Sequence, residues 1–232
     1  MSTSRSHGSR CVLVIAILLG LRASGGALEK RESTYVVGIH GVSPSEAYLT
    51  VRLSSCDSNL PNRGAMLRTT DGGVTWQRVW SSSGPSSIHA VTWSGKELLF
   101  FGTVGEEGPD LDPFVLLPGR GSRWRLVTIH RGDSKLEGVY RQGDRLNVRI
   151  QKIEVHSDDW TGPSVTYQSR DGGRSWKVLK RGEPLGDPAI AISHSSQDWQ
   201  IRLDQDGGYI VEKKGDAGYR AVSHFPAPSA CE

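Results

Sequence analysis

Short hydrophobic runs, separated by Gly, Asp, Ser and Pro, follow one another along most of the chain. Many of these runs are rich in Val, Ile, Leu and Tyr and alternate apolar with polar positions, as in Ala47–Leu53. A period of two is typical of half-buried strands, and turn residues between the runs mark their ends. We find no convincing amphipathic helix after residue 27. The pattern therefore predicts an all-β protein.

The first 27 residues follow a different pattern. Arg5 and Arg10 precede the unbroken apolar run Cys11–Leu21, and small residues then continue up to residue 27. This order of basic, apolar and small residues is typical of a secretory signal peptide. The run is shorter than the roughly 20 residues that span a bilayer. We expect residues 1–27 to be a signal peptide and the mature chain, 28–232, to be secreted or periplasmic, with a short uncleaved anchor as the alternative.

Two segments of the mature chain repeat one turn sequence. Thr69–Trp76 reads TTDGGVTW and Ser169–Trp176 reads SRDGGRSW. A degenerate copy, 119–127, keeps glycine and a tryptophan but lacks the aspartate, and a weaker copy, 213–222, has a tyrosine in the tryptophan place. Repeats of about 40 to 50 residues are typical of arrays of identical structural units, so each interval between successive copies is expected to hold one such unit.

Four strand-like runs fall in each interval, and Ala189–His194 is the expected first strand of the last unit. Four-stranded units at this spacing are typical of β-propeller blades. The approximate blade boundaries are 33–80, 86–129, 135–180 and 188–223.

The turn motif resembles the Asp-box, or BNR, repeat of sialidases, sortilin-type receptors and propellers like the photosystem II assembly factor. The resemblance implies a small β-propeller of four four-stranded blades after the signal peptide, with each Asp-box in the hairpin between the third and fourth strands. A five-blade ring with one concealed blade, and half of a ring completed by a partner, are the alternatives.

The residues of the motif have structural explanations. An aspartate can accept hydrogen bonds from the backbone of its own turn, and glycine permits a positive φ. A tryptophan fills the gap toward the neighbouring blade. We expect structural roles for Asp71, Gly73, Trp76, Trp124, Asp171, Gly173 and Trp176.

The number of cysteines falls from three to two when the expected signal peptide, residues 1–27, is left out. Cys56 and Cys231 remain, an even pair in an exported chain, so we expect one disulfide, with two free thiols as the alternative. Propeller topology places both on the top face at the seam between first and last blades, where a disulfide closing the ring would contribute on the order of 4–5 kcal/mol.

The net charge of +3 comes from three arginines in residues 1–27, so basic and acidic residues balance in the mature chain. Without excess positive charge we expect no nucleic-acid partner.

Acidic loops on the expected top face are one candidate for recognition, with Trp160 as an exposed aromatic anchor. In a propeller the first strand of each blade lies next to a central channel. Three of these innermost strands carry a histidine, and such histidines would approach the channel. Solvated loops and ordinarily packed histidines are the alternatives. The candidate ligand-binding residues are Glu106, Glu107, Asp110, Asp112, Asp158, Asp159, Trp160, His40, His89 and His194.

No cofactor or metal is expected, although the acidic loop 106–112 offers oxygen ligands for calcium without the regular spacing of a calcium loop. A sialidase-like hydrolase or carbohydrate-binding protein is the alternative function, but the Phe/Tyr-Arg-Ile-Pro motif of sialidases is absent. We therefore expect a non-catalytic binding or assembly module, monomeric and not membrane-spanning, that recognises a protein or glycan partner through its top loops.

Overall fold

The computed structural model describes residues 32–55, 62–105, 111–119, 123–153, 162–180 and 182–228. These ranges contain seventeen β-strands, paired antiparallel, and no helix. The prediction of an all-β fold is confirmed. No helix in these ranges has the length and apolarity that a membrane crossing requires.

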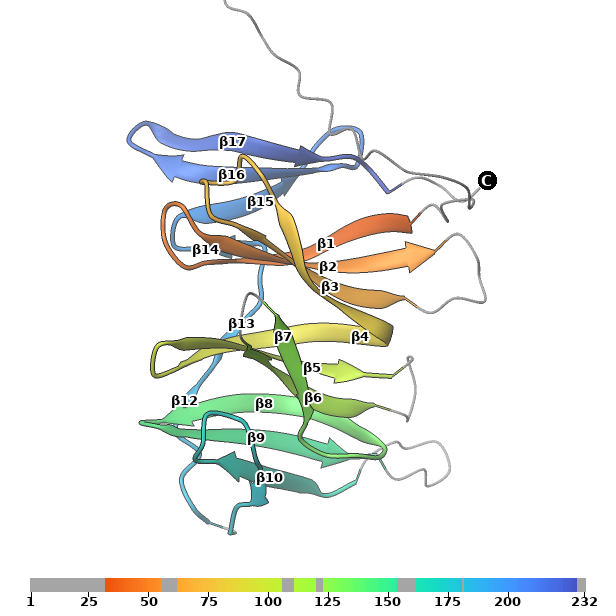
Figure 1. The fold of residues 1–232 in the computed structure, drawn as a ribbon, viewed down its shortest axis with the longest axis vertical. Coiled ribbons are helices and arrows are strands. Elements are labelled where there is room, and N and C mark those ends of the chain that lie inside the picture. The colour runs from red at the N-terminus through yellow and green to blue at the C-terminus, as the bar shows by residue number, and fades with distance from the viewer. Residues whose placement is uncertain are drawn as a thin grey trace, which may run out of the picture.

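The strands pair in an eight-stranded sheet, a five-stranded sheet and a four-stranded sheet. Because β4 changes its partner along its length, we describe the eight-stranded sheet as two units, one and two, and the other two sheets as units three and four (Figure 1). Unit one contains β1 (Glu32–Gly41), β2 (Ala47–Ser55), β3 (Arg63–Thr69) and the first part of β4 (Gln77–Ser94). Unit two contains the second part of β4, β5 (Glu97–Val104), β6 (Asp112–Pro118) and β7 (Trp124–Thr128). Unit three contains β8 (Ser134–Gln142), β9 (Arg145–Lys152), β10 (Ser164–Ser169) and β11 (Lys177–Val178). Unit four contains β14 (Ser195–Ser196), β15 (Trp199–Leu203), β16 (Tyr209–Gly215) and β17 (Gly218–Phe225).

Strand β4 belongs to two units. Its first part pairs with β3, from Gln77 opposite Arg68 to Pro85 opposite Arg63. Its second part pairs with β5, beginning with Ser86 opposite Val104. The sequence predicts two separate strands here, because the serine-rich segment between them contains Gly84 and Pro85. The segment instead continues the strand and changes its partner at the proline, whose missing N–H removes one ladder hydrogen bond.

The core consists of three apolar clusters, each at a junction between two units. One joins units four and one around Ile39, Leu49 and Trp199. A second joins units one and two around Met66 and Phe100. A third joins units two and three, with Phe101, Val115 and Val148 among its members. The units are therefore stacked in the order four, one, two, three, as Figure 1 shows from top to bottom.

The segment that links unit three to unit four crosses the first strands of the other units. Its β12 (Asp187–Pro188) pairs with β8, and its β13 (Ile190–Ala191) pairs with β4. Further along, Ser193 forms a bridge to Ile39 of β1, whose amide donates to the Ser193 carbonyl at 2.7 Å. We call residues 187–194 the connector. The sequence predicts Ala189–His194, within the connector, as the first strand of unit four, whereas the structure gives that place to β14.

The outer face of each end unit is polar. In β9 of unit three, Leu146, Val148 and Ile150 face unit two, so Arg149 faces outward and is exposed, whereas Asn147 on the same side is buried and donates to the Leu185 carbonyl at 2.5 Å. In unit four, Glu212 accepts hydrogen bonds from Gln200 at 2.6 Å and from Arg202 at 3.2 Å on the outward face. Within the described ranges no apolar cluster joins units three and four, the contact that a closed four-unit ring requires.

The disulfide prediction falls on Cys56 and Cys231, which both lie outside the described residues, as does the expected signal peptide, residues 1–27. The disulfide and the signal peptide therefore stay predictions. The seam at which the disulfide was expected is nevertheless present, because units one and four pack against each other around Trp199 and Val36.

Candidate functional site

The first copy of the turn motif, Thr69–Trp76, lies in the hairpin between β3 and β4. Asp71 Oδ1 accepts hydrogen bonds from the hydroxyl of Thr69 at 2.8 Å and from the amide of Thr75 at 2.9 Å. The Thr75 hydroxyl donates to Asp71 Oδ2 at 2.5 Å. These hydrogen bonds, chiefly those from Thr75, lower the pKa of Asp71 to about 2. The carboxylate is therefore ionised and fully used within its own turn.

The second copy of the turn motif, Ser169–Trp176, lies between β10 and β11 and has similar bonding. Asp171 Oδ1 accepts from the Ser169 hydroxyl at 2.8 Å and from the Ser175 amide at 2.9 Å. Burial raises the pKa of Asp171, but the hydrogen bonds from Ser175 and Ser169 outweigh it and bring the pKa to about 2. Gly73 and Gly173 occupy equivalent places with φ of 91° and 87°. Both turns thus hold an αL-type backbone around an ionised carboxylate.

The tryptophans of the repeats all point toward the preceding unit in the stack. Trp76 of unit one packs on the cluster of unit four, and its Nε1 donates to Ser223 Oγ at 2.9 Å. Trp124 of unit two packs edge-on against Tyr48 of unit one, with ring centroids 5.9 Å apart. Trp176 of unit three packs against Phe101 of unit two at 6.3 Å. The fourth counterpart, Tyr219, is 43% exposed, because no unit precedes it in the stack.

The candidate histidines are not brought together. His40 is buried in β1, and burial lowers its pKa. Desolvation also lowers the pKa of His89, although part of that residue stays accessible, and its Nε2 lies 3.1 Å from the hydroxyl of Thr103. His194 is exposed on the connector. Among the described residues no group of three or more His, Cys, Asp or Glu side chains is placed to hold a metal ion.

Most of the acidic candidates lie outside the described residues and stay predictions. These are Glu106, Glu107, Asp110, Asp158, Asp159 and Trp160. Asp112 is described, at the start of β6. Its Oδ1 accepts a hydrogen bond from the amide of Gly132 at 2.8 Å, so it fixes the neighbouring turn.

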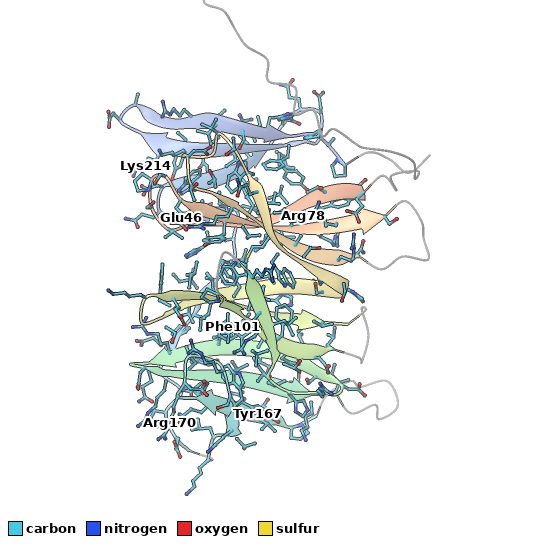
Figure 2. All side chains as sticks on the ribbon, viewed as in Figure 1. Glu46, Arg78, Phe101, Tyr167, Arg170 and Lys214 are labelled. Carbon is cyan, nitrogen blue, oxygen red and sulfur yellow. The ribbon has the colours of Figure 1, made fainter. Side chains whose placement is uncertain are left out.

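A cavity of about 360 Å³ lies at the junction of units one and two, and we call it the junction pocket. It sits at the hairpin-turn end of these units, toward Glu46 in Figure 2. Its lining includes Leu98 and Val79 and three aromatic side chains. The aromatic side chains are Tyr48, Trp93 and Trp124.

Charged groups surround the aromatic side chains of the junction pocket. Arg68 forms an ion pair with Glu46, with Nη2 2.8 Å from Oε1, and its guanidinium carbon lies 5.8 Å from the Tyr48 ring centroid. Burial raises the pKa of Tyr48 to about 12, so its phenol remains protonated. Its hydroxyl donates to Glu46 at 3.3 Å. The lining also contains Lys96, Glu97 and Arg123.

Sequence reasoning did not find this pocket. It assigned Trp124 a structural role only and placed recognition on the opposite, top face. A signal was nevertheless present, because the degenerate copy of the repeat, 119–127, lacks the aspartate. No protein-family model and no curated protein matches the chain. The resemblance to Asp-box proteins therefore rests on the motif residues themselves.

Proposed function

We propose that the chain is an exported, non-catalytic binding or assembly module made of four propeller-type Asp-box blades. The observation that carries the proposal is the junction pocket, whose aromatic and charged side chains line a concave site between two rigidly packed units. Pockets with apolar walls and a few oriented polar groups are typical of ligand-binding sites. The charged pair Arg68–Glu46 and the protonated phenol of Tyr48 suit hydrogen bonding to a ligand.

The rigidity of the blades supports this function. Each Asp-box ties its hairpin to an ionised carboxylate, and each tryptophan anchors that hairpin to the preceding unit. A recognition surface gains affinity when its side chains are held in the bound geometry beforehand. The four units supply such a scaffold, on which the hairpin turns and the top-face loops can recognise a protein or glycan partner.

The blade arrangement follows from the polarity of the end faces. Closing a ring between units three and four would bring the exposed Arg149 against Arg202 and Glu212. Burying such groups without new partners costs free energy. We therefore place the four blades in an arc that is open between the third and fourth, with the first and last blades in contact.

The experiment that tests the proposal compares binding with turnover. The mature chain, residues 28–232, is applied to an array of defined glycans and peptides and, in parallel, incubated with fluorogenic glycosides, sialosides included. We expect saturable, reversible binding that heat denaturation abolishes, and no release of the fluorophore. Release of the fluorophore would favour the hydrolase alternative, and absence of binding to every probe would contradict the module.

A further inference from the structure

We propose that the junction pocket binds an acidic saccharide, namely a pyranose that carries a carboxylate. The inference deepens the proposed function and rests on it. It differs from the sequence-based expectation, which placed recognition on the loops of the opposite face.

The aromatic walls of the junction pocket provide flat apolar surfaces for a sugar ring. Tyr48 and Trp124 meet at an interplanar angle of 89°, so that together they form a corner. Trp93, from the second part of β4, lines the same cavity. A pyranose presents apolar C–H groups on its faces and hydroxyl groups around its rim. Such a ring can cover an aromatic surface while its hydroxyl groups reach the polar groups nearby.

A carboxylate in the wall is available to the hydroxyl groups of such a ring. Arg68 and the Tyr48 hydroxyl both bind Oε1 of Glu46. The second oxygen, Oε2, has no hydrogen-bond partner among the described side chains. Since Arg68 and Tyr48 hold the carboxyl group in place, Oε2 is an oriented acceptor for a hydroxyl group of the ligand.

The charge of the lining favours an acidic ligand. Arg68 and Glu46 neutralise each other. Glu97 faces Arg174, whose Nη2 lies 3.4 Å from its Oε2. Lys96 and Arg123 also line the pocket, and neither has an ion-pair partner in the described part of the chain. Two uncompensated cations beside aromatic walls therefore select a ring that bears a negative charge.

The strand pairing favours a ring over an extended peptide. Tyr48 pairs with His40 and Arg68, and Arg68 pairs with Tyr48 and Gln77, so β2 and β3 are paired on both edges at these residues. A peptide strand cannot add to them. On this side of the pocket, recognition proceeds through side chains and ring faces.

The repeat explains why the cavity occurs at this junction. At the junction of units four and one, Gly73 of the Asp-box packs so closely that an added Cβ would lie 2.6 Å from Val222. At the junction of units two and three, a Cβ on Gly173 would lie 3.1 Å from Leu117. The hairpin between β6 and β7 lacks the box, and the cavity lies beside it, next to Gly119 and Arg123.

The test is a titration of the mature chain with tetragalacturonate, followed by calorimetry and by tryptophan fluorescence. The fully methyl-esterified tetramer is the matched probe without charge, and tetraglutamate is the acidic peptide probe. We expect the tetragalacturonate to bind at least about tenfold more tightly than the ester, since charge-assisted hydrogen bonds are roughly twice as strong as neutral ones. Equal binding of the ester, or tighter binding of tetraglutamate, would overturn the proposal.

Variants assign the binding to the pocket. Arg123→Gln should weaken tetragalacturonate binding about tenfold, whereas Arg125→Gln, on β7 but outside the lining of the junction pocket, should change it less than about twofold. Trp93→Leu should abolish binding, and Lys96→Gln provides a second test should Trp93→Leu not fold. If array binding persists unchanged in Arg123→Gln and Lys96→Gln, the binding module stands and the assignment to the junction pocket is wrong.

Discussion

Trp76 packs edge-on against Trp199, with ring centroids 6.3 Å apart and an interplanar angle of 72°. The first indole comes from the Asp-box hairpin of unit one and the second from β15 of unit four. The contact therefore joins the two units that lie farthest apart in the sequence. It shows that the first and last units are neighbours in the stack and that an Asp-box tryptophan connects them.

Replacing Trp76 should lower the free energy of unfolding more than replacing Tyr219, its counterpart in unit four. Trp76→Ala should lower the free energy of unfolding by about 3 kcal/mol, through lost packing on Trp199 and a lost hydrogen bond to Ser223. Tyr219→Ala should change it by less than about 0.5 kcal/mol, because Tyr219 contacts no preceding unit. Urea denaturation of both variants measures the difference. Similar losses for the two would indicate that units three and four pack together.

The repeat was predictable because its residues act locally. The Asp-box carboxylates bond to their own turns, so a sequence of eight residues suffices to place Asp71 and Asp171 in hairpins after the third strand of a unit. The alternating runs likewise predicted the strands of units one and two, since each buries one row of side chains. Elements that depend on local chemistry can be identified from one sequence.

The continuity of β4 and the connector were not predictable, because their pairing partners are distant. Ser86 looks like a loop residue, yet its hydroxyl accepts from the amide of Gly64 and donates to Ser82. The sequence predicts a strand over Ala189–His194 but not its partners, because its pairing to three units depends on distant residues and on a close approach to Gly38. The junction pocket needs side chains from both units one and two, and no short motif encodes such a meeting.

A methyl group at Gly73 should test how closely the Asp-box approaches unit four. Gly73→Ala combines a positive φ of 91° with a Cβ that would lie 2.6 Å from Val222. Gly95→Ala has a positive φ of 60° but no atom within 4 Å of the added Cβ. We expect a loss of about 1 kcal/mol for Gly95→Ala and a further 1–3 kcal/mol for Gly73→Ala. Thermal unfolding of both variants measures this, and equal losses would show that the approach is loose.

The Asp-box carboxylates should make the stability depend on pH in the acid range. The pKa of Asp71 and that of Asp171 are both about 2 in the folded chain, below the value of about 3.9 of an unfolded chain. Between these values the unfolded chain binds more protons. The contribution of the two carboxylates is therefore complete above about pH 4 and is lost as the pH falls toward 2.

Denaturation curves at several pH values measure this dependence. The double variant Asp71→Asn, Asp171→Asn should be less stable than the wild type at pH 6, and its stability should fall less steeply between pH 4 and 2. Asp187→Asn removes a similar charge in the connector and is the control. Parallel curves for the double variant and the wild type would contradict the assignment, and carbon NMR titration of the two carboxyl groups gives the pKa values directly.

A side chain added at Gly38 of β1 should displace the connector from β1. A Cβ on Gly38 would lie 2.8 Å from the carbonyl oxygen of Ser193, the group that accepts the amide of Ile39. Gly38→Ala should therefore displace residues 187–194 while the three apolar clusters keep the units together. Gly84→Ala, where an added Cβ meets no atom within 4 Å, is the control.

Limited proteolysis with elastase, which cleaves after small residues, measures the release. We expect faster cleavage near Ala189 and Ala191 in Gly38→Ala, and faster exchange of the Ile192 amide, which donates to the His89 carbonyl in the folded chain. The free energy of unfolding should fall by about 1–3 kcal/mol, the usual cost of inserting a methyl group into a packed site. If cleavage and exchange in the connector stayed at the level of Gly84→Ala, β1 would have yielded instead, and the connector would be held by β8 and β4 alone.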